Sequence, residues 1–145
     1  MKKIVCIFSF FLSVAFSVAQ DNTQKIERAC LDYIEGFYEG DTAKLVRSLQ
    51  PTLYKYGYCK NKTSGMYEPD GQMSFIQAKE YAKQVYTKKN FAKAGSPKKV
   101  EVLDIMNSIA SAKVTAWWGV DYILLSKTAD KWMIEQVLWE GPLQK

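Results

Sequence analysis

Histidine is absent from this 145-residue chain, and cysteine occurs only three times. A Ser-His-Asp triad and a Cys-His pair both need an imidazole as base, so the sequence excludes both kinds of nucleophilic catalysis. Zinc sites are built mainly from thiolates and imidazoles, and this composition argues against one. No phosphate loop, dinucleotide fingerprint or paired-carboxylate motif occurs either. We therefore expect no metal and no cofactor.

A strong charge of either sign is also missing, because the net charge of the chain is only +5. Several lysines gather in segment 88–99, but no aromatic or arginine-rich pattern accompanies them. Such a cluster favours a solvated loop over a nucleic-acid interface. We expect no nucleic-acid partner.

The chain has one long hydrophobic run, and it lies at the N-terminus. Two lysines precede the apolar residues Ile4–Phe16, and Ser17–Ala19 forms a small-x-small site. This pattern is typical of a secretory signal peptide, here residues 1–19, while a retained anchor is the alternative. No cysteine stands where a lipoprotein signal needs one. We expect export to the periplasm or outside the cell, without a membrane anchor, as one mature domain of residues 20–145.

Cys30 and Cys59 are the cysteines that remain after such a cleavage. An oxidising compartment permits a disulfide between them. Cys30, however, falls on the apolar stripe of a predicted helix, which favours a small buried thiol. The sequence leaves both alternatives open.

Helical spacing of apolar residues and capping residues predict three helices. The first extends from Asp21, as its N-cap, to Gly40, as its C-terminal cap. Asp41 can cap a short second helix that Pro51 ends. A capping box at Ser74 begins the third. The apolar stripe of the first helix is Ile26, Cys30, Tyr33, Ile34 and Phe37.

Alternating, β-branched and aromatic segments predict the strands. The predicted strands are 53–59, 99–106, 109–118, 120–127 and 131–139, with a brief strand open at 66–67 and a turn at Pro69–Gly71. Short turns join the last strands into an antiparallel meander. The order of helices and strands predicts the α+β class, with the helices packed in a strongly curved antiparallel sheet.

Aromatic side chains are the first candidates for a binding site. Tyr54, Tyr56 and Tyr58 alternate along one predicted strand, and Trp117 lies next to a possible turn at Gly119. Aromatic residues inside a curved sheet either line a ligand pocket or fill the core. We take Tyr54, Tyr56 and Trp117 as candidate ligand-binding residues.

Asp121 is the candidate carboxylate, because it stands in an otherwise apolar strand. Facing a dry cavity, it would have a raised pKa and could act as a neutral hydrogen-bond donor. Facing water on the outer side of the strand, it would be an ordinary surface acid. Alternation alone does not choose between the two faces.

Four segments of the chain resemble a known family. They are Asp32–Asp41, Ser111–Val114, Val120–Tyr122 and Lys131–Ile134 with Trp139. The chain is similar to the "putative lumazine-binding" branch of the nuclear transport factor 2-like superfamily, which also holds ketosteroid isomerase-like and SnoaL-like proteins. The resemblance implies a cystatin-like cone of helices in a bent sheet, and commonly a homodimer.

The resemblance to ketosteroid isomerases also implies roles for single residues. It places Tyr33 and Asp121 at the positions of the two donors that hold an enolate oxygen. The position of the acid that moves the proton falls near Gly57, where no acid exists. Two donors without a base could bind a ligand but not efficiently shuttle a proton.

We therefore expect an exported small-molecule-binding, non-catalytic domain with an aromatic-lined pocket. One alternative is a lyase or isomerase of ketone or polycyclic substrates that uses Tyr33 and Asp121 as an oxyanion pair. Another is a ligand-free module that dimerises through its sheet. A cavity larger than about 300 Å³ would favour the two hypotheses that involve a ligand.

Overall fold

The computed structural model describes the backbone of residues 5–143 and the side chains of residues 21–143. The predicted signal peptide, residues 1–19, lies outside the residues with described side chains and stays a prediction. Within the described side chains, no helix is long and apolar enough to cross a membrane.

Three helices form within residues 5–143, as the capping residues predict. They are α1 (Val5–Glu39), α2 (Thr42–Ser48) and α3 (Phe75–Thr87). Gly40 follows α1 with a φ of +68°, Asp41 accepts hydrogen bonds from the first turn of α2, and Ser74 forms a capping box with Gln77. The predicted start at Asp21 is wrong, because α1 is helical on both sides of this residue. A good cap residue does not begin a helix when the preceding residues are also helical.

Six strands form one strongly curved sheet in the order β2-β1-β6-β5-β4-β3. The strands are β1 (Leu49–Lys60), β2 (Tyr67–Ser74), β3 (Lys99–Ile105), β4 (Ile109–Ala116), β5 (Gly119–Thr128) and β6 (Lys131–Gly141). The predicted meander is confirmed as β3 to β6. The expectation of a wholly antiparallel sheet is wrong at one place, because β1 pairs with β6 in parallel. A parallel pair needs a long crossover, which the chain between β1 and β6 provides.

Strand β2 continues through Pro69–Gly71, which the sequence predicts as a turn. It pairs with β1 on both sides of Asp70 and Gly71, because Pro69 lies opposite Tyr58 and Gln72 lies opposite Tyr56. Proline is tolerated there because β2 is an edge strand and the register shifts at this point. Gly71 has a φ of +61°, so the turn residues form an irregularity within the strand rather than its end.

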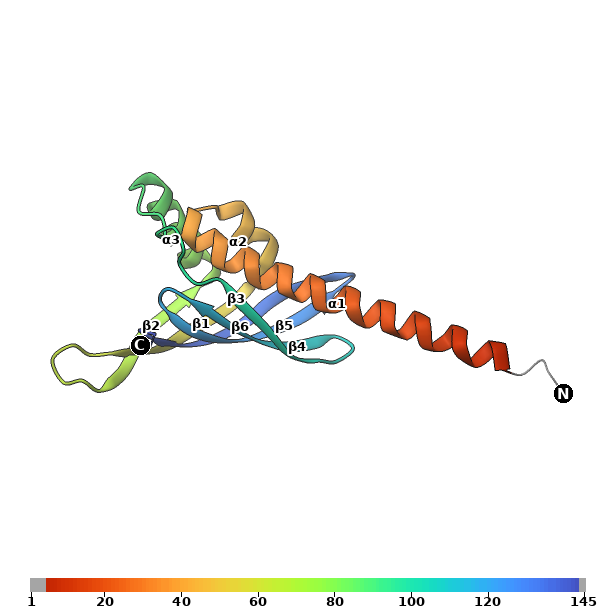
Figure 1. The fold of residues 1–145 in the computed structure, drawn as a ribbon. Helices are drawn as coiled ribbons and strands as arrows, with labels where there is room; N and C mark the ends of the chain where they lie inside the picture. Colours follow the sequence, from red (N-terminus) through yellow and green to blue (C-terminus); the bar gives the residue numbers. More distant parts are fainter. Residues whose placement is uncertain (1–4, 144–145) are drawn as a thin grey trace.

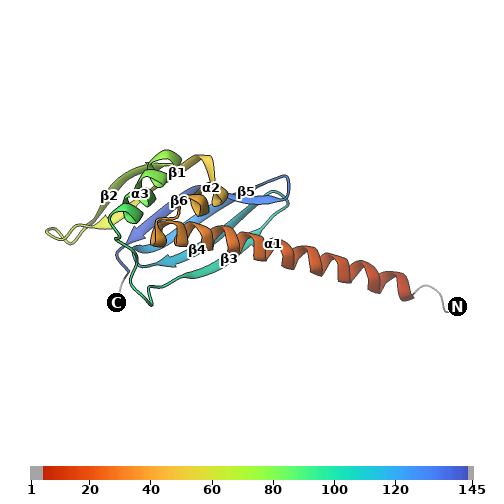
Figure 2. The same cartoon turned by 90° about the horizontal axis from the view of Figure 1, so that it is seen from above.

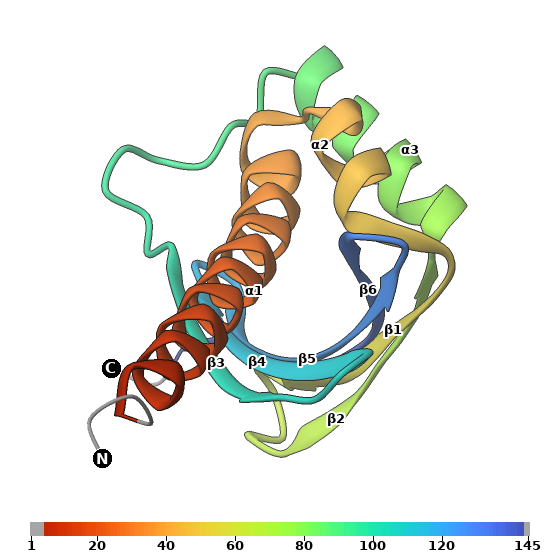
Figure 3. The same ribbon diagram turned by 90° about the vertical axis from the view of Figure 1, so that its right-hand side faces the viewer.

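The helices lie inside the curve of the sheet, with α1 running along the concave side (Figures 1, 2 and 3). Its stripe of Ile26, Cys30, Tyr33, Ile34 and Phe37 is buried, as predicted. Trp132 and Ile134 from β6 are buried in the same core, and the Trp132 indole donates a hydrogen bond to Asn22 Oδ1 of α1 over 3.1 Å. Trp132 and Ile134 therefore mark the inward face of β6, and the α+β class is confirmed.

Candidate ligand-binding site

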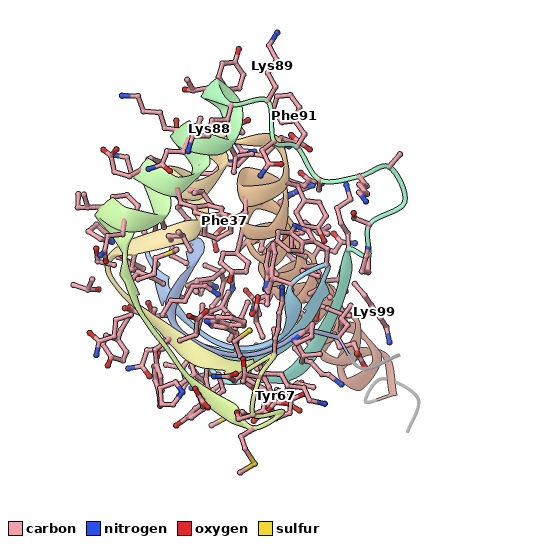
Figure 4. All side chains as sticks on the ribbon, turned by 90° about the vertical axis from the view of Figure 1, so that its left-hand side faces the viewer. Phe37, Tyr67, Lys88, Lys89, Phe91 and Lys99 are labelled. Atoms are coloured by element: carbon pink, nitrogen blue, oxygen red, sulfur yellow. The ribbon has the colours of Figure 1, made fainter. Side chains whose placement is uncertain are left out.

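A cavity of about 740 Å³ lies between the sheet, α1, α3 and the loop that follows α3. This volume is typical of small-molecule sites. Its lining includes Phe37, Lys55, Tyr81, Trp117, Trp118 and Trp139. The side chain of Phe37 points into the curve of the sheet, with Phe91 of the loop above it (Figure 4). A second hollow of about 490 Å³ borders the same loop but contains no buried charged group.

Tyr38 holds this loop against the curved sheet. Its hydroxyl donates to the carbonyl oxygen of Pro97 over 2.5 Å and accepts from the Trp117 N–H over 2.8 Å. The Ala92 N–H donates to the Tyr38 carbonyl over 3.0 Å. One residue of α1 therefore fixes both the loop and the β4–β5 turn at the cavity.

Three buried side chains and the partly buried Trp118 form a hydrogen-bonded network beside the cavity. The Tyr33 hydroxyl donates to Asp121 Oδ2 over 3.0 Å, and the Trp118 indole N–H donates to both oxygens of Asp121 over 3.0 and 3.1 Å. Lys55 Nζ donates to the Tyr33 hydroxyl oxygen over 2.8 Å and lies 3.7 Å from Asp121 Oδ1. Of these four, Lys55 and Trp118 line the cavity, and Tyr33 and Asp121 lie behind them.

Burial shifts the pKa values in this network toward the neutral forms. It raises the pKa of Asp121, against the opposing effects of Lys55, Trp118 and Tyr33, and it lowers the pKa of Lys55, against the opposing charge of Asp121. The pKa of Tyr33 is raised well above its usual value, first by burial and then by Asp121. Of these two shifts, the hydrogen bonds agree better with the lowered pKa of Lys55. The ionised form of Asp121 is stabilised by two donors besides Lys55, whereas the charged form of Lys55 has only one close acceptor.

The structure brings together some of the predicted site residues. Tyr33 and Asp121 meet on the inner side of the sheet, which answers the question that alternation left open. Trp117 lines the cavity. Tyr54 and Tyr56 do not: their rings lie against each other in a tilted arrangement, with centroids 5.4 Å apart, on the face of β1 opposite to Lys55. The expected inward orientation of these two tyrosines is therefore corrected.

Lys55 is the site residue that the sequence analysis misses. It alternates with Leu53 and Gly57 on the buried face of β1. A lysine that alternates with small and apolar residues indicates that this side of the strand is buried. The tyrosines on the other side are more numerous, and they favour the opposite orientation of the strand. Rings of Tyr33, Trp118 and Trp139 surround its ammonium group, with centroids 5.5, 5.8 and 5.3 Å from Nζ.

Gly57 explains why the acid position of the isomerases is empty here. A Cβ atom at this residue would lie 2.1 Å from the carbonyl oxygen of Trp139 and 2.4 Å from its ring. The indole of Trp139 therefore occupies the space that a side chain at position 57 would need. No acid could enter the site at this residue without moving β6.

The two cysteines are free thiols in the structure. Cys30 is buried and Cys59 is partly buried at the cavity wall. Burial is the main cause that raises the pKa of the Cys30 thiol to about 12. Among residues with described side chains, no group of three or more cysteine or acidic residues is placed to hold a metal ion.

Comparison with known proteins places this fold. The family model described as "Putative lumazine-binding" matches residues 21–140. A comparison with curated proteins found no match. A protein of unknown function from Shewanella baltica is 16% identical, with a TM-score of 0.59 over 83% of this chain and 94% of that chain. One from Silicibacter pomeroyi is 14% identical, with a TM-score of 0.57 over 86% and 96%.

Both of these solved structures are described as nuclear transport factor 2-like. A third, a domain of unknown function with a cystatin-like fold from Nostoc punctiforme, is 13% identical, with a TM-score of 0.51 over 81% of this chain and 75% of that chain. At such low identity these likenesses show the fold alone. With the family model covering most of the chain, the protein belongs to the "putative lumazine-binding" family, and its fold is that of nuclear transport factor 2-like proteins.

Proposed function

We propose that this protein is an exported domain that binds a small molecule in its cavity and does not catalyse a reaction. The observation that carries this proposal is the cavity itself, about 740 Å³, with aromatic walls and one buried charged side chain. Ligand sites commonly combine a mostly apolar wall with a few polar groups that fix orientation. The description of the family model supports the same class of function.

Two features support binding over the alternative of a lyase or isomerase. The Tyr33 hydroxyl already donates to Asp121, and neither residue lines the cavity, so the pair does not face a substrate oxygen as an oxyanion hole must. Trp139 also fills the space where the isomerases carry their proton-moving acid. The network is better suited to hold Lys55 and Trp118 in place.

The experiment is native mass spectrometry of the protein purified from its own host, with a variant that fills the cavity. Met73 lines the cavity and pairs with Lys55 across β1 and β2, so a Met73→Trp substitution places an indole beside Lys55. Tyr58→Trp places the same indole on the exposed outer face of β1 and serves as the control. A bound mass in the wild type and in Tyr58→Trp, absent from Met73→Trp, supports the proposal. Protein that carries no ligand in any form counts against it.

Export is supported by the sequence pattern of residues 1–19. We expect the mature protein to begin at or near Gln20 and to stay in solution after cell fractionation. N-terminal sequencing of the exported protein checks this. A chain that still begins at Met1, or that remains with membranes after a carbonate wash, would contradict the expectation.

A second candidate function, pairing through the sheet, rests on the outer face. Tyr122 of β5 pairs with Leu138 of β6, which pairs with Tyr56 of β1, so the three side chains form one row across the sheet. Leu124 and Tyr54 lie in the adjacent row, on either side of Gln136, and four of these five apolar and aromatic residues are exposed. An apolar row of this kind marks an interaction surface in many soluble proteins. We infer a homodimer, which is compatible with ligand binding inside the cone.

A further inference from the structure

Lys55 combines three properties: burial, a place in the cavity wall and close aromatic neighbours. Its side chain is only 10% exposed, yet it contributes to the cavity wall. Three aromatic rings, those of Tyr33, Trp118 and Trp139, lie within 6 Å of its Nζ atom. A lysine in such surroundings loses much of the hydration that normally favours its charged form.

The hydrogen bonds around Lys55 leave part of its amino group unused. The Tyr33 hydroxyl donates its hydrogen to Asp121. Toward Lys55, the Tyr33 oxygen can therefore act only as a hydrogen-bond acceptor. Asp121 Oδ1, at 3.7 Å, is too far for a direct hydrogen bond. A neutral Lys55 amine would thus give one N–H to Tyr33 and keep its lone pair. Burial lowers the pKa of Lys55, which increases the fraction of this neutral form.

We propose that Lys55 captures the ligand of the cavity by forming a reversible imine with an aldehyde or ketone group of a flat aromatic compound. This inference rests on the proposed function, because the compound must first enter the cavity. The aromatic walls select the flat ring system, and Lys55 selects the carbonyl group. Desolvated lysines in apolar pockets are the usual nucleophiles of this chemistry.

The chemical step is balanced without an oxidant or reductant. The lone pair of Lys55 Nζ attacks the carbonyl carbon, and the C=O electron pair moves to oxygen, which takes one proton from nitrogen to give a carbinolamine. Loss of the second N–H proton together with the hydroxyl group forms the C=N bond and one water molecule. Asp121, linked to Lys55 through Tyr33, can hold a proton in transit. Addition of water reverses the capture.

The test uses pyridoxal, a flat aromatic aldehyde, with sodium cyanoborohydride to reduce any imine at neutral pH. Peptide mapping by mass spectrometry then compares the lysines of the folded mature protein. Lys93 is the internal control, because it lines the same cavity but is exposed. We expect Lys55 to carry the adduct first, and a Lys55→Arg variant to lose that adduct while its exposed lysines react as before.

Adducts on Lys93 and other exposed lysines, with Lys55 unmodified in the folded protein, would overturn the inference. The wild-type map decides this even if Lys55→Arg fails to fold. The Met73→Trp variant separates this result from failure of the proposed function. Adduct at Lys55 that is lost in Met73→Trp but kept in Tyr58→Trp supports both. If Met73→Trp carries as much adduct at Lys55 as the wild type, then pyridoxal reaches a reactive Lys55 amine without entering the cavity. The proposed function would then fail.

Discussion

At the scale of single residues, Asp121 has a different role from the one a desolvated acid alone would suggest. An isolated buried carboxyl group costs stability, and replacing it with an amide would then be neutral or stabilising. The two oxygens of Asp121, however, accept from both Tyr33 and Trp118. An amide at this position offers only one oxygen, so one buried donor would face an NH₂ group.

We therefore predict that Asp121→Asn lowers the free energy of unfolding by about 1–3 kcal/mol, the usual cost of a buried unsatisfied donor. Urea denaturation at neutral pH measures the change. Asp104→Asn, at an exposed position in β3, is the control and should change stability little. An Asp121→Asn variant as stable as the wild type would mean that the Tyr33 and Trp118 bonds contribute nothing to folding.

Cys30 gives the structure a predictable response to alkaline pH. Burial raises the pKa of its thiol from 9.0 to about 12. Between these values the unfolded chain loses the thiol proton and the folded chain keeps it. The folded state then binds more protons, so the free energy of unfolding falls as pH rises, by up to about 1.4 kcal/mol per pH unit.

A Cys30→Ala variant should lack this part of the pH dependence. Its lost packing lowers stability equally at all pH values, and Tyr33, whose pKa is also raised, remains in both proteins. Urea denaturation at about pH 8 and about pH 10 measures the two slopes. Wild type and variant with parallel pH profiles would place the Cys30 thiol in a wetter environment than the structure gives it.

The residue scale also shows what the sequence could and could not predict about the site. Tyr33 and Asp121 could be paired because the family resemblance aligns them. Lys55 could not be found in this way, because its importance depends on which face of β1 is buried. Three tyrosines on one face and a lysine on the other suggested the opposite orientation. The cross-strand neighbours that decide the face lie far away in the sequence.

At the scale of elements, local sequence signals predicted helix ends and strands well where neighbouring helix or strand pairing did not override them. Gly40, Asp41 and Ser74 act as the caps that their residue types suggest. Asp21 does not, because helix continues on its N-terminal side. Pro69–Gly71 forms part of β2 because the pairing with β1 outweighs its turn preference. The parallel β1–β6 pair could not be predicted from local pattern.

The contact between β6 and α1 gives a prediction at this scale. Trp132 is 2% exposed and bonds to Asn22 of α1. Trp132→Ala should lower the free energy of unfolding by about 3–5 kcal/mol, because it leaves a large void in the core. Thermal and urea denaturation measure it. Trp117→Ala is the matched control, since Trp117 is 51% exposed and should cost less than about 1 kcal/mol. Equal costs for the two variants would contradict the packing.

At the scale of the whole molecule, the curved sheet presents two faces with different surroundings. The concave face, covered by α1 and α3, holds the cavity and the buried network. The tilted pair of Tyr54 and Tyr56 and the row of Tyr122, Leu138 and Tyr56 lie on the convex face. A ligand inside the cone and a partner on the outside would therefore not compete for the same residues.

The convex row is uncharged at its centre, so it can meet a second copy of itself without repulsion between like charges. A two-fold interface uses the same patch on both subunits, which suits a row that crosses the middle of the sheet. A stable dimer buries about 800 Å² per partner, from about 20–30 residues on each side, so neighbouring side chains of the same face must take part. Leu138, at the centre of the row, is the residue whose change should matter most.

We predict that the mature protein sediments as a dimer and that Leu138→Glu shifts it to monomer, because two carboxylates would be buried against each other at the centre of the interface. Sedimentation velocity at micromolar concentration measures the assembly, and circular dichroism checks that the fold persists. Ile76→Glu is the matched control: Ile76 is 62% exposed on α3, which covers the concave face and not the convex one, and this variant should remain dimeric. A wild-type monomer would remove the pairing proposal. A dimer that survives Leu138→Glu would place the interface elsewhere and leave the convex row without this role.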